Sequence, residues 1–314
     1  MPVIYISEAC PVTFYQVGVP PVAGRNVVHL GQGPFSKQIG PYQQQIRYTQ
    51  KWQKTDQIVI QAKSEIDNII MQLVTCNGTV QKETAFEIKS TTIIGQTWRV
   101  YETVMQLADV PENEYYLLIT AGTGDNKLML YSEPQYVTLS DPDTMLYTYK
   151  HSGNYLDIIY STGVEFQFRC ESALREYVPG NKLTVYQDQK LNGVQLSAYP
   201  YDQYKLMVGG VKGAYGAPNW LAKKMNYIFS NNFVLVEGMQ FLRADQSKME
   251  ANRAAQYPMA GWVLDVIPAI NRYSNIYDLS LNDTISVAYN ITAGIFGVLD
   301  GTPAMEQIKL LERK

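Results

Sequence analysis

The sequence predicts a mainly β protein with two consecutive β-sandwich-like domains, the second containing one short helix, and with extended N- and C-terminal arms. Short runs of β-branched and aromatic residues alternate with polar residues along most of the chain. Turn dipeptides such as Asn77-Gly78 and Asn192-Gly193 separate many of these runs. Only one segment, 218–229, carries apolar residues at clear helical spacing.

Residues 1–42 are expected to form an N-terminal extended arm. Prolines and glycines recur through this segment, and apolar patches such as Val3–Ile6 and Val27–Leu30 are too short to bury themselves. An arm of this kind needs a surface to lie on. That surface is either its own domain or a neighbouring subunit, and the sequence leaves both open.

Residues 43–138 are expected to form the first β-sandwich, immunoglobulin-like or jelly-roll. Ile58 and Ile60 alternate with polar neighbours, and the strand-like run that contains Met71 and Leu73 ends at a strong hairpin turn, Asn77-Gly78. A further strand is expected within residues 98–107.

The stretch 115–137 is predicted to close this domain as a β-hairpin. Two strand-like runs, 115–120 and 128–131, flank a glycine-rich reversal. Pro134 follows the second run. Because proline lacks a ladder donor, we expect the chain to lie on an edge or leave the sheet there.

Residues 139–276 are expected to form a second β-rich domain, with a helix near 218–229. Its clearest strand is 164–171, where Val164, Phe166, Phe168 and Cys170 alternate with polar residues. Further strands are predicted at 183–186, 204–208 and 262–266, and a hairpin around Glu237-Gly238. Residues 277–314 are expected to be a C-terminal arm or strands, at 286–296 and 307–311.

Composition favours a folded protein and excludes some partners. The 314 residues carry a net charge of −3 and include 24 tyrosines. Tyrosine suits both protein interfaces and exposed β-sheet, so its abundance fits either. With no concentrated basic run, no nucleic-acid contact is predicted. No signal peptide or apolar run of membrane-spanning length is found, so we expect neither secretion nor a membrane partner.

No catalytic, cofactor-binding or metal-binding residue is predicted, and no cofactor. His29 and His151 are the only histidines, and neither has the setting of a nucleophile system. Cys10, Cys76 and Cys170 are too dispersed for a zinc site or a disulfide framework. The glycines at 122–127 and 209–216 lack the spacing of a phosphate loop.

Acidic residues could in principle form a glycosidase pair. Glu165 and Glu171 fall on the expected outer face of one strand, so a solvated face is the better interpretation. Asp157 is another carboxylate without a placed partner. Asp141 and Asp143 lack the remaining ligands of a calcium loop. Tyrosines at 199, 201, 204 and 215 suit sugar stacking, subunit contact or plain β-surface.

Several phrases of the sequence resemble those of a protein family. They are QKWQKTDQIVIQ (50–61), YYLLITAG (115–122), LYSEPQYV (130–137), EFQFRCE (165–171), VYQDQ (185–189) and GAPNWLAKKMNYIF (216–229). Together they span about residues 43–265 and are similar to tail- or neck-associated virion proteins of Bacteroides-type tailed phages and prophages, including crAss-like phages. These phrases are strand and turn segments without a catalytic motif, so no site residues follow from them.

The resemblance implies a virion structural protein of a phage tail, neck ring or baseplate, made in the bacterial host cytoplasm. It implies a cyclic homo-oligomer whose partners are copies of itself and other tail or neck proteins. The alternative is a glycan- or receptor-binding β-sandwich module on the tail. An enzyme such as a polysaccharide depolymerase is the weakest hypothesis, and we expect no enzymatic activity.

Overall fold

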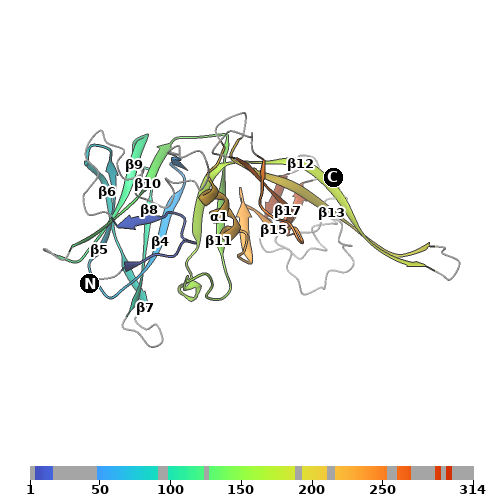
Figure 1. Cartoon of the computed structure of the whole chain (residues 1–314), viewed down its shortest axis with the longest axis horizontal. Coiled ribbons are helices and arrows are strands. Elements are labelled where there is room, and N and C mark those ends of the chain that lie inside the picture. The colour runs from blue at the N-terminus through green and yellow to red at the C-terminus, as the bar shows by residue number, and fades with distance from the viewer. Residues whose placement is uncertain are drawn as a thin grey trace, which may run out of the picture. The chain divides into compact units, whose positions relative to one another are not determined.

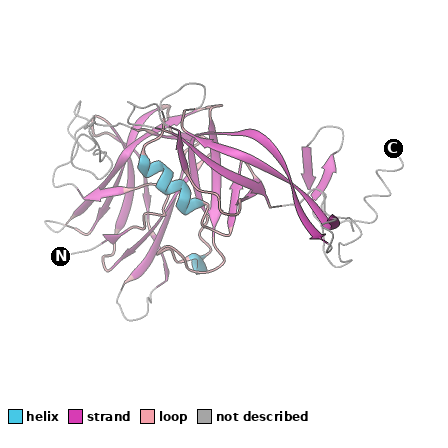
Figure 2. Ribbon diagram, turned by 45° about the vertical axis from the view of Figure 1, so that its right-hand side comes forward, coloured by secondary structure: helices cyan, strands magenta, loops and turns pink. Residues whose placement is uncertain are grey.

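The computed structural model describes residues 4–16, 48–90, 98–123, 127–187, 193–210, 216–252, 260–269, 287–290 and 295–298. By its contacts the chain divides into two compact units, Met1–Ile270 and Asn271–Lys314. The described residues are mainly β-strand, as predicted, and α1 (Asn219–Ile228) is the one α-helix among them (Figures 1 and 2). The predicted boundaries at residues 42, 138 and 276 stay predictions.

The N-terminal part of the first unit is a β-sandwich of two sheets. One sheet has the order β1 (Ile4–Tyr5), β4 (Gln57–Ser64), β8 (Arg99–Gln106), β7 (Glu87–Ser90). The other has the order β2 (Phe14–Gln16), β10 (Leu128–Thr138), β9 (Asn113–Ala121), β5 (Ile69–Thr75), β6 (Val80–Ala85), and β3 (Gln50–Gln53) also pairs with β10.

The inward face of each sheet supplies the sandwich core. Ile58 and Ile60 of β4 and Met71 and Leu73 of β5 are all fully buried in it, together with Trp52. The predicted alternation is therefore confirmed. Gly78 takes a φ of +88° in the turn between β5 and β6, which explains the Asn-Gly pair there.

The closing hairpin is confirmed as β9 and β10, but the expectation for Pro134 is wrong. β10 neither leaves the sheet nor lies on its edge there. On the side of β10 that faces β9, Pro134 directly follows a shift in the pairing register. On the opposite side of β10, β2 pairs with residues 130–132 and β3 with residues 135–138, so Pro134 lies in the gap between these two strands. The missing donor is tolerated because a bulge already interrupts the ladder at this point.

The C-terminal part of the first unit is a β-barrel, a closure that the sequence pattern did not indicate. Its pairings run in a ring through six strands: β12 (Phe166–Gln187), β11 (Thr144–Lys150), β14 (Phe233–Val236), β15 (Met239–Arg243), β17 (Gly261–Pro268) and β13 (Gly193–Val208), which returns to β12. β16 (Glu250–Asn252) pairs with residues 261–263 of β17, on the same edge as β15, which pairs with residues 266–268.

Helix α1 packs against the barrel core with the predicted stripe. Leu221, Met225 and Ile228 are fully buried, in the same cluster as Phe166 and Phe168 of β12. Pro218 precedes the helix in an extended conformation, and Asn231 then bonds the last carbonyls through its side chain. The predicted helix, its start and its stop are confirmed.

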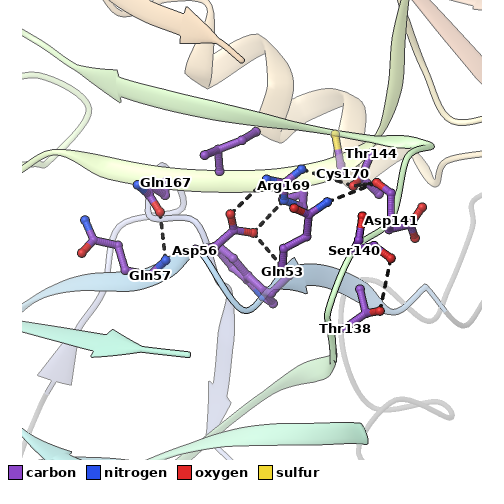
Figure 3. Close-up of polar contacts among 12 residues, drawn as sticks. Gln53, Asp56, Gln57, Thr138, Ser140, Asp141, Thr144, Gln167, Arg169 and Cys170 are labelled. Atoms are coloured by element: carbon purple, nitrogen blue, oxygen red, sulfur yellow. Dashed lines mark hydrogen bonds and ion pairs between the residues drawn. The ribbon is translucent and has the colours of Figure 1, made fainter. Parts of the chain in front are cut away.

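A buried polar junction joins the sandwich to the barrel. Arg169 of β12 donates to both carboxylate oxygens of Asp56, Nε to Oδ2 at 2.6 Å and Nη2 to Oδ1 at 3.0 Å (Figure 3). The amide of Gln57 donates to Gln167, and Lys51 forms ion pairs with Glu171 and Asp141.

The expectation that the outer face of β12 is solvated is therefore wrong for most of that face. Arg169 is 4% exposed, and the Glu171 side chain is 17% exposed. The alternation of apolar and polar residues identified the two faces correctly. It did not reveal that the polar face meets a second domain.

In the second unit, β18 (Val287–Asn290) and β19 (Ile295–Val298) pair as an antiparallel hairpin. The single strand expected within residues 286–296 is therefore two strands. The strand expected at 307–311 lies outside the described residues.

Candidate assembly surface

The two longest described strands, β12 and β13, extend beyond the barrel as a two-stranded ribbon. β12 pairs with β11 only up to Glu171, and β13 pairs with β17 only from Tyr204 onward. Between these limits, residues 177–187 and 193–203 pair only with each other among the described residues. Figure 1 shows this part as the long yellow hairpin that projects from the barrel. We call residues 177–187 and 193–203 the ribbon.

The ribbon exposes large apolar side chains. Leu183 and Val185 of β12 are 51% and 52% exposed, and Leu196 of β13 is 64% exposed. Four further exposed apolar residues complete the set: Tyr177, Val178, Tyr186 and Tyr201. An isolated two-stranded hairpin is marginally stable in water, and exposed apolar area of this kind is typical of an interaction surface.

The ribbon has few charged side chains that would prevent its strands from pairing with other chains. Its described residues include only two charged side chains, Lys182 and Asp202, and Asp202 is 7% exposed and accepts a hydrogen bond from Tyr177. Soluble proteins commonly place charged residues on open strands because these prevent pairing with other chains. The ribbon lacks this protection along most of both edges.

A glycine and a tyrosine fix the cross-strand packing of the ribbon. Gly180 pairs with Tyr201, and a Cβ atom at Gly180 would lie 2.3 Å from the Tyr201 ring. The ring therefore occupies the space above the glycine, and this contact orders an otherwise weak strand position. At the base, Tyr204 packs against Tyr177 and Phe241, which joins the ribbon to the barrel core.

Sequence patterns reveal only parts of this element. The strands predicted at 183–186 and 204–208 are confirmed, but each is a fragment of a much longer strand. In the sequence, Pro179-Gly180 and Pro200 interrupt the alternating strand pattern and therefore resemble strand ends. Of the four tyrosines considered for stacking, Tyr201 is exposed and Tyr204 is half-buried, while nothing is described of the Tyr199 side chain or of residue 215.

A separate polar groove lies between the sandwich and the barrel. It has a volume of about 410 Å³ and is lined by Glu102, Glu87 and Glu165, among others. Glu102 accepts hydrogen bonds from Gln61 and Thr162, and Glu165 pairs with Lys150 at 2.8 Å. The second carboxylate of the candidate glycosidase pair, Glu171, does not line this groove and is engaged by Lys51.

Among the remaining candidate residues, His151, Asp141 and Asp157 have structural partners. His151 stacks on Tyr155 in a loop, and its Nδ1 contacts the Gly153 backbone, while His29 lies outside the described residues. Gly122 takes a φ of +79° at the end of β9. Asp157 accepts from Tyr5, and Asp141 pairs with Lys51.

Among the described residues, no three His, Cys, Asp or Glu side chains gather as metal ligands do. Cys10 and Cys170 are buried and Cys76 is exposed, and among the described residues none of the three forms a disulfide. Burial raises the pKa of the Cys10 thiol to about 11 and that of Cys170 to about 12. Within the described ranges, no helix has the length and apolar character needed to cross a bilayer.

The chain matches no family model, no curated protein and no solved structure.

Proposed function

We propose that this protein is a structural component of a bacteriophage virion, in the tail, neck ring or baseplate, and that it assembles as a cyclic homo-oligomer. The observation that carries the proposal is the ribbon, which combines exposed apolar side chains with an almost uncharged surface. Such a surface gains free energy when a neighbouring protein covers it.

The ribbon has two long edges, one on each strand, and neither edge has a further partner strand among the described residues. A subunit in a closed ring needs two different contact surfaces, one for each neighbour, because ring contacts are heterologous. An element with two open edges fits this requirement. The neighbours are therefore proposed to be copies of the same chain.

The junction between sandwich and barrel supports a building-block role. The paired charges of Asp56 and Arg169 are buried, and the hydrogen bonds between them have fixed directions. A subunit whose two domains are held in this way presents its contact surfaces at a defined angle, as a symmetric ring requires.

The virion assignment comes from the sequence resemblance described above. On that assignment the protein is made in the host cytoplasm, resides in the virion, and contacts other tail or neck proteins. We propose no enzymatic activity, no cofactor, no nucleic-acid contact and no membrane contact.

The test is the native mass of the purified protein, measured by light scattering after size exclusion at two concentrations. We expect one discrete assembly of at least six copies. A clean monomer at both concentrations would contradict self-assembly through the ribbon.

The alternative is a glycan- or receptor-binding module on the tail. The exposed tyrosines of the ribbon, Tyr177, Tyr186 and Tyr201, favour it because aromatic rings stack on sugars. This alternative predicts retention on host polysaccharide that is lost when these tyrosines are replaced, together with a monomeric native mass.

A further inference from the structure

The N-terminal residues 4–16, which we call the strap, complete both sheets of the sandwich. β1 pairs with the open side of β4, with Tyr5 opposite Lys63, and β2 pairs with β10. Both contacts are main-chain pairings at a sheet edge. This is the way in which an extended peptide binds when it adds a strand to an existing sheet.

Side chains of the barrel and of α1 hold the middle of the strap by donating hydrogen bonds to the backbone carbonyl groups of the strap. Lys224 of α1 donates to the carbonyls of Glu8 and Cys10, and Tyr149 of β11 donates to that of Ala9 at 2.6 Å. Three successive residues of the strap are therefore held by side chains that lie more than a hundred positions away in sequence. Ala9, Cys10 and Val12 are each buried by this docking.

Charge complementarity adds to the fit. Glu8 accepts from Lys223 at 2.5 Å and from Tyr227 at 3.1 Å. Beneath the strap, Lys224 is 3% exposed and Glu133 is 5% exposed. Oε2 of Glu133 has no hydrogen-bond partner in the described part of the chain.

This site, which we call the strap groove, comprises the edges of β4 and β10 with Tyr149, Lys223 and Lys224. An empty groove would leave a buried lysine and two sheet edges without their partners, which costs free energy. A chain whose own strap has left must therefore take up another peptide of matching chemistry. In an assembly of copies, the matching peptide is the strap of a neighbour.

The chain between the strap and β3 is long enough for this exchange. Residues 17–49 separate them. A segment of about 30 residues spans up to about 100 Å when fully extended. Because every contact that holds the strap is distant in sequence, the same contacts form whether the strap comes from the same copy or from the next.

We propose that, in the assembled protein, the strap of each copy docks in the strap groove of a second copy, so that neighbouring copies are tied by an exchanged N-terminal segment. This inference rests on the proposed homo-oligomer and names one of its contacts. Exchange of an identical element keeps every contact of the closed chain and adds a link between subunits.

A disulfide trap tests the exchange. One chain carries Tyr5→Cys and a second, tagged chain carries Lys63→Cys, both in a Cys76→Ser background that removes the exposed native thiol. The two positions face each other across the β1–β4 pairing, which is compatible with disulfide geometry. The two chains are co-expressed, purified together and oxidised. In a randomly mixed, equimolar assembly about half of the Tyr5→Cys straps dock on a Lys63→Cys copy. We therefore expect about half of the Tyr5→Cys chains to shift from monomer to covalent dimer, with peptide mass analysis showing the two introduced thiols linked to each other.

Two controls accompany the trap. A single chain that carries both Tyr5→Cys and Lys63→Cys shows that the pairing forms and that the variants fold. A pair of chains with Tyr5→Cys and Lys89→Cys reports chance collisions, because Lys89 lies in β7 at the opposite edge of the same sheet.

The native mass of the same sample separates the possible failures. An assembly without covalent dimers between the two variants, combined with closure of the two-cysteine chain within itself, would overturn the exchange and leave the homo-oligomer standing. A sample that stays monomeric and forms no covalent dimer would overturn both.

Discussion

Arg169 in the barrel and Asp56 in the sandwich form a two-pronged ion pair that is almost completely buried. Their side chains are 5% and 1% exposed, and Asp56 also accepts from the amide of Gln53 at 2.7 Å. Two parallel charge-assisted bonds fix both distance and orientation. This pair therefore sets the position of one domain against the other.

Removing one partner of this pair should destabilise the protein strongly. Arg169→Met leaves the Asp56 carboxylate buried without its cation, a situation that costs about 3–5 kcal/mol. We expect the free energy of unfolding to fall by this amount in urea denaturation. The double variant Arg169→Met/Asp56→Leu should lose less, because it leaves no buried charge unpaired; the other partner of Arg169, Glu237, is 47% exposed.

The exposed pair Lys150–Glu165 provides the matched control. Its side chains are 46% and 42% exposed at 2.8 Å separation. Lys150→Met should change the free energy of unfolding by no more than about 1 kcal/mol. Equal losses at Arg169 and Lys150 would show that the junction does not depend on the buried pair.

Gly180→Ala should damage the ribbon and leave the barrel intact. The added Cβ would lie 2.3 Å from the Tyr201 ring, so the ring must move and the cross-strand contact is lost. The assembled mass should fall, while the unfolding midpoint of the body stays near that of the wild type. Gly193→Ala is the control in the same ribbon, since its Cβ would meet only Val185 at an ordinary 3.5 Å.

If Gly180→Ala and Gly193→Ala assemble alike, the Gly180–Tyr201 contact does not order the ribbon. A further variant, Gly180→Ala/Tyr201→Ala, should relieve the clash. Its ribbon should regain strand pairing, measured as hydrogen-exchange protection of residues 177–187.

Glu133 should make stability depend on pH. Burial raises the pKa of this carboxyl from 4.5 to about 7. The folded state therefore holds the proton more tightly than the unfolded state. The resulting stabilisation is fully present below about pH 4.5 and is lost as pH rises through about 7.

Glu133→Gln should remove this dependence. Each pKa unit corresponds to about 1.4 kcal/mol, so the wild type should lose on the order of 3 kcal/mol relative to the variant between pH 4.5 and 7. If the free energy of unfolding of the two proteins changed with pH in parallel over this range, the Glu133 carboxyl would not be desolvated beneath the strap.

Lys224 should show the opposite dependence at higher pH. Burial lowers the pKa of its amine from 10.5 to about 8, so the folded state gives up the proton more readily than the unfolded state. Stability should therefore rise relative to Lys224→Met as pH increases from about 8 to 10.5. Thermal unfolding over this range checks the sign.

The local elements of this fold follow from local signals. The hairpin turns at Gly78 and Gly238 take φ values of +88° and +80°, which the glycines allow at no steric cost. The helix followed from Leu221, Met225 and Ile228 at helical spacing. Each depends on residues that are close in sequence.

The features that the sequence did not reveal depend on residues far apart. Alternation placed Arg169 on a polar face, but only the approach of Asp56 from the sandwich buries that face. Closure of the barrel depends on the pairing of β13 with β17. Lys224 is one sequence signal for a buried polar contact, because it lies on the apolar, buried stripe of α1, where a charged residue is unexpected.

The sequence pattern does not indicate the full length of the ribbon strands for a different reason. Prolines and glycine normally end a strand, yet here Pro179 and Pro200 lie within paired strands. A two-stranded ribbon leaves one side of each strand unpaired, so a missing donor on that side costs little. The same residues that obscure the ribbon in the sequence are compatible with its open edges.

The most direct test of assembly through the ribbon compares two triple variants by native mass. One replaces Leu183, Val185 and Leu196 of the ribbon with threonine. The other replaces three comparably exposed residues of the sandwich, Val80, Ile88 and Val104, which are 47%, 50% and 44% exposed. Threonine keeps strand propensity while removing apolar area.

We predict that the ribbon variant is reduced to a monomer or small species, while the sandwich variant keeps the assembled mass of the wild type. An unchanged assembly of the ribbon variant, with its fold intact by circular dichroism, would contradict the claim that assembly of this protein requires the ribbon.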